Sequence, residues 1–211
     1  MLTAIIDYDS GNLHSVHKAF ERMALETGAG RVVVTNDPDV VLSADRIVLP
    51  GDGAFPACRA ALCDSDVYDA MIEAVEVKAR PFLGICVGMQ LMAKDGHEHE
   101  KTLGLGWVDG SVRRIAPQDS SLKVPHIGWN DLVFRADHPV LKDVKTGDHA
   151  YFVHSYQMVM SEADHMLAHA DYSGRITAIV GRDTMVGTQF HPEKSAATGL
   201  QMISNFLTWN P

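Results

Sequence analysis

Several features that would place a protein in a membrane or outside the cell are missing from this sequence. No apolar run approaches the roughly 20 residues that a bilayer-spanning helix needs. The N-terminal segment carries no basic residues ahead of its apolar stretch and reaches Asp7 and Asp9 early, so we expect no secretory signal peptide. These absences predict a cytoplasmic protein without a membrane partner.

Positive charge and cysteine are also scarce. Lysine and arginine together number 18 against 27 aspartate and glutamate, and the formal net charge of −9 argues against a nucleic-acid partner. Three cysteines make an odd number, which argues against a disulfide framework and fits a reducing compartment where a free thiol can do chemistry. The sequence has neither a Gly-x-x-x-x-Gly-Lys phosphate loop nor a dinucleotide fingerprint, so we expect no nucleotide site on this chain.

The sequence does contain an alternation of short apolar runs and amphipathic stretches over 211 residues, which suits one domain spanning residues 1–211. In the first half the pattern predicts an α/β fold with a mainly parallel central sheet flanked by helices. In the second half, short strand-like runs predict a mixed or antiparallel extension. The predicted strands of the first half are 2–7, 31–35, 46–50 and 81–85, and the predicted helices are 13–26, 68–79, 87–94 and, at the C-terminus, 199–210.

The stretch FLGICVGMQLM places Cys86 where an apolar strand turns into a helix, with Gly84 and Gly88 two positions to either side. This spacing is typical of a nucleophile elbow, in which small neighbours let the strand and the helix approach closely while the nucleophile points into a crevice at the strand end. The alternative is a buried structural cysteine. The segment around Cys58 and Cys63 indicates a helix, and both are interpreted as ordinary half-buried thiols.

A cysteine nucleophile needs a base, and the base needs an orienting group. The segment TQFHPEKS offers His191 directly after a predicted strand and Glu193 two residues later. Pro192 restricts the backbone of His191, and in an extended segment residues two apart point the same way. We therefore expect Glu193 to contact one imidazole nitrogen while the other faces the sulfur of Cys86. The alternative is a surface turn with an incidental histidine.

Two further glycine- or histidine-rich segments invite a functional interpretation. Pro50 stops a predicted strand and is followed by Gly51, Asp52 and Gly53, whose backbone N–H groups could form an oxyanion hole; a plain glycine-rich turn is the alternative. The alternating His and Glu residues of GHEHE (96–100) make a poor metal site by themselves, and we predict a solvated connection. Thiolate and imidazole supply nucleophile and proton transfer, so we expect neither a metal nor a cofactor.

These segments, taken together, resemble the class I (triad) glutamine amidotransferases. Finer features resemble, within that class, the family of glutaminase subunits of imidazole glycerol phosphate synthase, over essentially the whole chain. The segments that carry the resemblance are IIDYDSGNLHSV (5–16), LPGDGAF (49–55), the cysteine elbow, PHIGWN (125–130), YFVHSY (151–156) and QFHPEKS (189–195).

The resemblance implies a mechanism and a set of site residues. The thiolate of Cys86 attacks the carboxamide of glutamine, His191 protonates the leaving ammonia and later activates water, and Glu193 holds the imidazole. A γ-glutamyl thioester forms and is released as glutamate. The resemblance assigns the oxyanion hole and the glutamine site to Gly51, Asp52, Gly53, Val87, Gln90, His154, Ser155 and Tyr156.

The resemblance also implies a partner, a (β/α)₈-barrel cyclase that forms a heterodimer with this chain and receives the ammonia. That cyclase makes imidazole glycerol phosphate and an aminoimidazole carboxamide ribotide in histidine biosynthesis. The positions expected near the partner are Asn12, Trp129, Tyr151 and Lys194. Asp52 and the Asp9-Ser10 pair depart from the smaller residues frequent in the family, which affects the expected oxyanion geometry and the expected interface contacts.

Other functions remain open on the sequence alone. A glutaminase could serve another acceptor, such as anthranilate, guanylate or pyridoxal phosphate synthesis, although PHIGWN and the lack of an appended synthetase domain favour the first interpretation. A non-catalytic regulatory subunit could retain the fold, but the intact Cys86, His191 and Glu193 argue against it. A general cysteine peptidase is a further alternative, and Gln90 with the His-Pro-Glu segment favours a small amide substrate instead.

Overall fold

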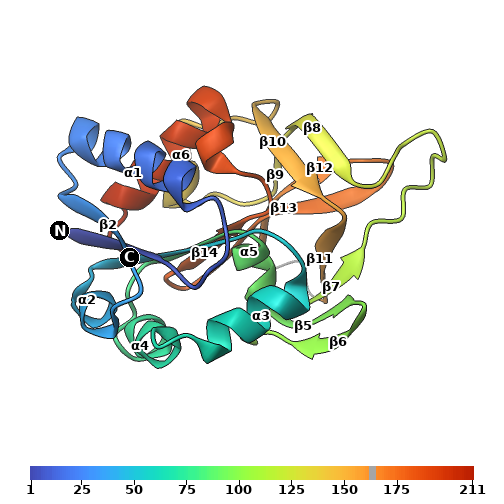
Figure 1. Cartoon of the computed structure of the whole chain (residues 1–211). Coiled ribbons are helices and arrows are strands. Elements are labelled where there is room, and N and C mark those ends of the chain that lie inside the picture. Colours follow the sequence, from blue (N-terminus) through green and yellow to red (C-terminus); the bar gives the residue numbers. More distant parts are fainter. Residues whose placement is uncertain (162–164) are drawn as a thin grey trace.

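An eight-stranded mixed sheet forms the centre of the computed structural model, which describes residues 1–161 and 165–211 (Figure 1). Five neighbouring strands run parallel and three antiparallel strands extend the sheet at one side, which confirms the predicted α/β class with a mixed extension. In spatial order the strands are β2 (Arg31–Thr35), β1 (Leu2–Ile6), β3 (Arg46–Gly51), β4 (Phe82–Cys86), β14 (Met185–Thr188), β13 (Arg175–Arg182), β12 (Met166–Asp171) and β9 (Val133–Phe134).

The central strands β3 and β4 are buried along their whole length because helices cover both faces of the sheet. Such strands read as continuous apolar runs in the sequence, which is why their positions were predictable. Their carboxyl ends meet side by side, since Gly51 at the end of β3 pairs with Cys86 at the end of β4. This edge of the parallel sheet is where α/β folds place their ligands.

Helices cover the two faces in separate groups (Figure 1). On one face, α1 (Leu13–Thr27) packs against α6 (Ala196–Thr208), and Phe20 meets Phe206 edge to face with ring centroids 6.3 Å apart. On the other face lie α2 (Pro38–Ser43), α3 (Phe55–Asp64) and α4 (Tyr68–Ile72), the last continuing into the π-helical η1 (Glu73–Val77). Within the described residues, every helix is too short or too polar to cross a lipid bilayer.

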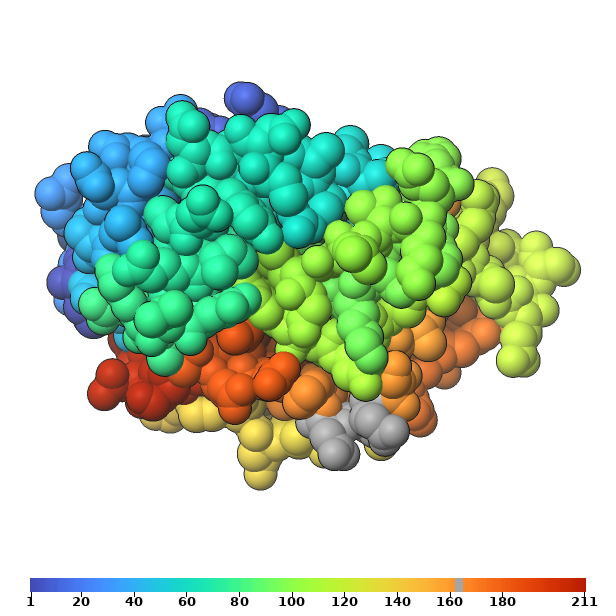
Figure 2. Space-filling view, turned by 90° about the horizontal axis from the view of Figure 1, so that it is seen from below, coloured from blue at the N-terminus to red at the C-terminus, as the bar shows by residue number. Residues whose placement is uncertain are grey.

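Two smaller sheets complete the second half. One has the order β11 (Tyr156–Met160), β7 (Val108–Arg114), β5 (Ala93–Glu98) and β6 (Glu100–Leu103); the other pairs β10 (His149–His154) with β8 (His126–Asp131) in antiparallel register. Seen from below, α2 to α4 form a surface beside the β5–β7 segment (Figure 2). The short α5 (Val87–Leu91) lies between β4 and β5.

Two predictions about these elements are wrong. The helix expected over 87–94 ends at Leu91, and Ala93 begins β5 because it pairs with Val108 of β7. The GHEHE segment, expected as a loop, lies in the β5–β6 hairpin. The helix expected over 68–79 is present from Tyr68 to Val77, although it changes from α to π at Glu73. Helix α2 and strand β12 were not predicted.

Candidate active site

The turn from β4 into α5 puts Cys86 in a strained backbone conformation. Its φ of 54° and ψ of −110° are unusual for a residue that carries a side chain. The flanking glycines are required by close backbone approach: a Cβ on Gly84 would lie 2.6 Å from the carbonyl oxygen of Gly88. A Cβ on Gly88 would overlap the carbonyl oxygen of Leu49 in β3. This geometry is that of the nucleophile elbow expected from the sequence.

His191 follows β14, the neighbour of β4 in the sheet, and is close enough for Cys86 to affect its imidazole although 105 positions separate them (191 minus 86). Its Nδ1 lies 2.8 Å from Oε1 of Glu193, whose side chain is fully buried. The structure therefore brings together the three side chains that the sequence suggested as a triad. The local reason differs from the prediction, since Pro192–Lys194 form a 3₁₀ turn and not an extended segment.

Electrostatics favour a protonated His191. Burial lowers the pKa of this imidazole, but hydrogen bonds with Cys86 and Glu193 and their negative charges outweigh burial and raise the pKa to about 10. The backbone of His191 is held at both ends: its N–H donates to the Tyr151 carbonyl at 3.1 Å, and its carbonyl accepts from the Ser195 hydroxyl at 2.6 Å. An imidazolium in a fixed position next to a thiol is suited to give a proton to a leaving group.

A hollow of about 230 Å³ opens next to Cys86. Most of the residues expected to bind substrate line it, and Gly51 does not: it is buried in β3, where a Cβ would come within 2.8 Å of the Gly88 nitrogen and the Tyr8 hydroxyl. Three lining residues were not predicted, namely Glu98, Pro125 and Val153. The full lining is Asp52, Gly53, Cys86, Val87, Gln90, Glu98, Pro125, Val153, His154, Ser155 and Tyr156.

Glu98 is the functional candidate that sequence reasoning missed. It lies in the GHEHE segment, whose pattern suggests only a weak metal site or a loop. The β5–β6 hairpin carries it to α3, where its Oε2 accepts a 2.7 Å hydrogen bond from the Phe55 N–H. Among the described residues, no cluster of three or more His, Cys, Asp or Glu side chains could hold a metal ion.

The loop after β3 is held from outside the pocket. The Ser10 hydroxyl lies 2.9 Å from the Asp52 carbonyl, to which it can donate, and it also lies 3.3 Å from the Asp52 N–H. The Asp52 N–H is therefore directed at Ser10 and not at the sulfur of Cys86. The thiol of Cys58 also contacts Ser10, at 3.3 Å, and burial raises its pKa. The expectation that Cys58 and Cys63 are alike is wrong: Cys58 is buried and Cys63 is exposed.

The four residues expected near a partner lie on neighbouring parts of the fold, since the turn Pro192–Lys194 contacts both β10 and α1. Trp129 and Tyr151 face each other across the β8–β10 pair, with ring centroids 5.9 Å apart and Trp129 53% exposed. Lys194 is exposed in the turn that holds Glu193. Asn12 caps α1, its side-chain oxygen accepting from the Ser15 N–H at 3.3 Å.

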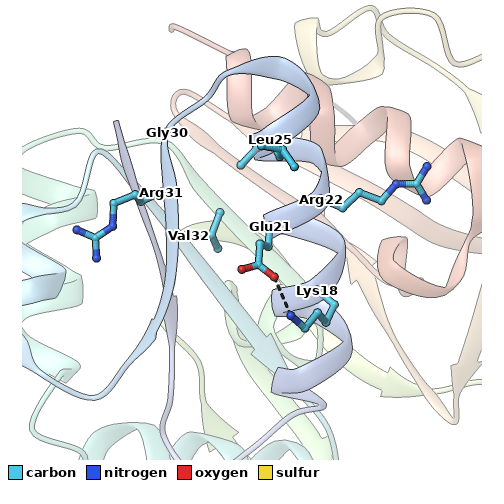
Figure 3. Close-up of a pocket in the computed structure, with 8 residues that line it drawn as sticks. Lys18, Glu21, Arg22, Leu25, Gly30, Arg31 and Val32 are labelled. Carbon is cyan, nitrogen blue, oxygen red and sulfur yellow. Dashed lines mark hydrogen bonds and ion pairs between the residues drawn. The ribbon is translucent and has the colours of Figure 1, made fainter.

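A larger groove, of about 620 Å³, lies between α1 and β2 and has a different character (Figure 3). Lys18 and Glu21 pair across 2.8 Å on its wall, and Leu25 and Arg31 also line it. Its lining contains neither a thiol nor an imidazole. The smaller hollow beside Cys86 is therefore the better candidate for chemistry.

Comparisons with known proteins agree with this geometry. The family model "Glutamine amidotransferase class-I" matches residues 4–209. The chain is 68% identical to "Imidazole glycerol phosphate synthase subunit HisH" of Ruegeria pomeroyi and 65% identical to the protein of that name of Cereibacter sphaeroides, each over all of both chains. Among solved structures it resembles a Thermoplasma acidophilum protein described as a GMP synthase subunit, with a TM-score of 0.68, 18% identity and coverage of 98% and 92% of the two chains. A glutamine amidotransferase from Thermotoga maritima gives a TM-score of 0.61 at 18% identity, covering 94% and 78%.

Proposed function

Because the chain belongs to the class-I glutamine amidotransferase family, we propose that it is the glutaminase subunit of imidazole glycerol phosphate synthase. Relatives of that name align with it from end to end, at 53–68% identity for those compared. The observation that carries the proposal is the Cys86–His191–Glu193 arrangement beside a hollow of about 230 Å³. The hydrophobic core is continuous through both halves, which supports one glutamine amidotransferase domain over residues 1–211.

The chemistry follows from the charges in the site. The thiolate of Cys86 attacks the carboxamide carbon of glutamine, and the C–N bond breaks as His191 gives its proton to the leaving ammonia. The γ-glutamyl group remains on sulfur as a thioester. Neutral His191 then takes a proton from water, the resulting hydroxide attacks the thioester, and glutamate leaves. Glu193 holds the imidazole through the 2.8 Å contact in both steps.

The negative oxygen of the tetrahedral intermediates needs hydrogen-bond donors. The backbone N–H of Val87, at the start of α5, is one candidate, and the Gly51-Asp52-Gly53 loop is the other. Since the Asp52 N–H is directed at the Ser10 hydroxyl, the loop has to rearrange before this group can contribute. Gly53, with a φ of 111°, supplies a position where the backbone can turn without a side-chain clash.

The pocket wall suits the charged end of glutamine. Glu98 supplies a carboxylate and Gln90 an amide to bind the α-ammonium group, and Ser155 supplies a hydroxyl, beside His154 and Tyr156, for the α-carboxylate. A small apolar amide without these charges would leave such polar groups unpaired. The pocket therefore favours free glutamine over an amide that lacks the α-ammonium and α-carboxylate groups.

The relatives are named as subunits, and a complex follows from the proposed function. We propose a (β/α)₈-barrel cyclase as the partner in a cytoplasmic heterodimer, receiving ammonia without its release to water. That cyclase forms imidazole glycerol phosphate and aminoimidazole carboxamide ribotide in histidine biosynthesis. The exposed Trp129, its neighbour Tyr151, Lys194 and the region of Asn12 are the proposed contact positions.

The test is a coupled assay. Glutamate release from glutamine is measured for this chain alone, then with the cyclase of the same organism, then with the cyclase and its nucleotide ligand. The proposal predicts strong stimulation on complex formation. Equal turnover in all three mixtures would argue for a glutaminase that serves another acceptor.

Cys86→Ala is the matched control. It should abolish glutamine-dependent product while the cyclase in the same complex still uses added ammonium salt. Full glutaminase activity in this variant would contradict the assignment of the nucleophile. Absence of glutaminase activity in the wild-type complex would instead favour a non-catalytic regulatory subunit.

A further inference from the structure

A row of hydrogen-bonded side chains leads from strand β8 to the wall of the substrate pocket. The amide of Asn130 lies 3.2 Å from Nε2 of His126, and Nδ1 of His126 lies 3.0 Å from Nε2 of His154. Nδ1 of His154 lies 2.8 Å from the Tyr156 carbonyl oxygen. His126 and His154 are directly opposite each other in the β8–β10 register, which brings their rings together.

The Tyr156 carbonyl determines which atom donates and which accepts in every hydrogen bond of the row. The Tyr156 carbonyl can only accept, so Nδ1 of His154 carries the hydrogen and its Nε2 has a free lone pair. Nδ1 of His126 must then donate, and its Nε2 accepts from the amide of Asn130. Each ring is neutral in this scheme, and burial lowers the pKa of both histidines to about 4, which keeps them so at neutral pH.

His126 is packed so that its ring cannot turn freely. It stacks on Phe152 with centroids 4.8 Å apart and packs at a tilt against Tyr172 with centroids 4.1 Å apart. Only 2% of its surface is exposed. The ring plane and the hydrogen-bond direction are therefore both set by its surroundings.

The row ends on a carbonyl that also orients Gln90. The Tyr156 carbonyl accepts a second hydrogen bond, 3.0 Å long, from Nε2 of Gln90. The same nitrogen donates to Oε1 of Gln189 at 3.1 Å, so both of its hydrogens are used. The oxygen Oε1 of Gln90, in a residue that lines the pocket, is the group left to accept from a ligand.

We propose that His126 is a positioning residue for the substrate. Acting through His154 and the Tyr156 carbonyl, it keeps the amide of Gln90 turned so that Oε1 accepts from the α-ammonium group of glutamine. The spacing of Cys86 and Gln90 matches the length of glutamine. Gln90 lies one helical turn, about 5.4 Å, beyond Cys86. The carboxamide carbon and the α-nitrogen of glutamine are separated by roughly 5 Å. If the amide of Gln90 were rotated by 180°, it would present its N–H groups to the cation instead of its oxygen. This inference rests on the proposed function.

The experiment compares two substrates in the complex with the cyclase. L-Glutamine has the α-ammonium group, and glutaramate has the same carboxamide and carboxylate without it. The discrimination ratio is kcat/KM for glutamine divided by kcat/KM for glutaramate. His126→Phe should lower this ratio about tenfold, because a hydrogen bond to a charged group is worth at least a factor of ten. The change should be in KM for glutamine, with kcat/KM for glutaramate kept within about twofold.

Three further variants separate positioning from general damage. His138→Phe is the matched control: this histidine accepts a 3.2 Å hydrogen bond from the Val140 N–H and packs on Trp209, away from the pocket, so the ratio should not change. His126→Gln keeps a donor toward His154 and should recover most of the ratio. Asn130→Ala removes the outer donor at a half-buried position, together with that side chain's bonds to the Asp171 carbonyl and the Asp131 N–H, and should lower the ratio about two- to threefold.

An equal loss of kcat/KM for both substrates in His126→Phe would overturn the inference, since a purely structural role affects both alike. An unchanged ratio would overturn it as well. If His126→Phe does not fold, Asn130→Ala decides, and an unchanged ratio there overturns the inference. A wild-type complex that hydrolyses no glutamine would contradict the proposed function instead, so the two failures can be told apart.

Discussion

The strained backbone of Cys86 leads to a prediction in which removing a side chain makes the protein more stable. We expect Cys86→Gly to be more stable than Cys86→Ala. A residue with a Cβ at φ 54° and ψ −110° carries a conformational energy of about 1–3 kcal/mol, which glycine avoids. Both variants lack the thiol and should be inactive as glutaminases, so the comparison reports stability alone.

The magnitude comes from three opposing contributions. The glycine variant is stabilised because it avoids the strain energy, about 3 kcal/mol at the upper end for this conformation. It loses about 1 kcal/mol through the greater freedom of the unfolded chain, and about 0.8 kcal/mol through the buried methyl that alanine keeps. With the strain at this upper end, the net expectation is a gain of about 1 kcal/mol for glycine. Ala4→Gly is the matched control, because Ala4 is fully buried in strand β1 and has an ordinary backbone; it should lose about 1–2 kcal/mol.

Urea unfolding followed by circular dichroism measures both pairs, and thermal unfolding checks them at about 2–4 °C per kcal/mol for a chain of this size. The signs of the two alanine-to-glycine changes should be opposite. If glycine at position 86 is less stable than alanine by the same amount as in the Ala4 pair, the elbow stores no strain and the reasoning is refuted.

Three other perturbations have defined outcomes. Gly88→Ala places a Cβ on the Leu49 carbonyl oxygen and should lower the free energy of unfolding by about 3 kcal/mol in urea titrations, whereas a loss below about 1 kcal/mol would contradict the close approach. Glu193→Gln should lower the pKa of His191 and reduce kcat for glutamine about 10²- to 10⁴-fold, and retained kcat would exclude an orienting role. Burial lowers the pKa of His154 to about 4, so the unfolded chain binds the proton first as pH falls below about 6.5. Stability should therefore fall between about pH 6.5 and 4, with His154 contributing up to about 1.4 kcal/mol per pH unit and the similarly depressed His126 adding to it, and a flat urea midpoint over this range would contradict neutral buried rings.

The parallel half of the fold was predictable because its strands are short apolar runs buried on both faces. β3 and β4 show this directly, since every residue in them is buried. The boundaries after Leu91 were not predictable, because residues 87–94 have a continuous helical pattern. What ends the helix is the pairing of Ala93 with Val108, a contact with a strand further along the chain.

In the site, too, local motifs were predictable and contacts between residues far apart in the sequence were not. The elbow at Cys86 and the His-Pro-Glu segment were visible because each is a local motif with a mechanical reason for its spacing. Glu98 was missed because nothing near it in sequence indicates that the hairpin places it on Phe55, 43 positions away. His126 lies within the recognisable segment PHIGWN, but its partner His154 is 28 positions further on, so their contact has no local signal.

The catalytic side chains are in place, but one proposed oxyanion donor is not. His191 contacts the buried carboxylate of Glu193 and has a pKa raised to about 10, so the imidazole already carries the proton that the leaving ammonia needs. The Asp52 N–H, by contrast, is directed at Ser10, and this donor stabilises no oxyanion in that orientation. The absence of one oxyanion donor costs about 10²- to 10³-fold in kcat. We therefore expect the loop after β3, and not the triad, to limit glutamine hydrolysis by the isolated chain.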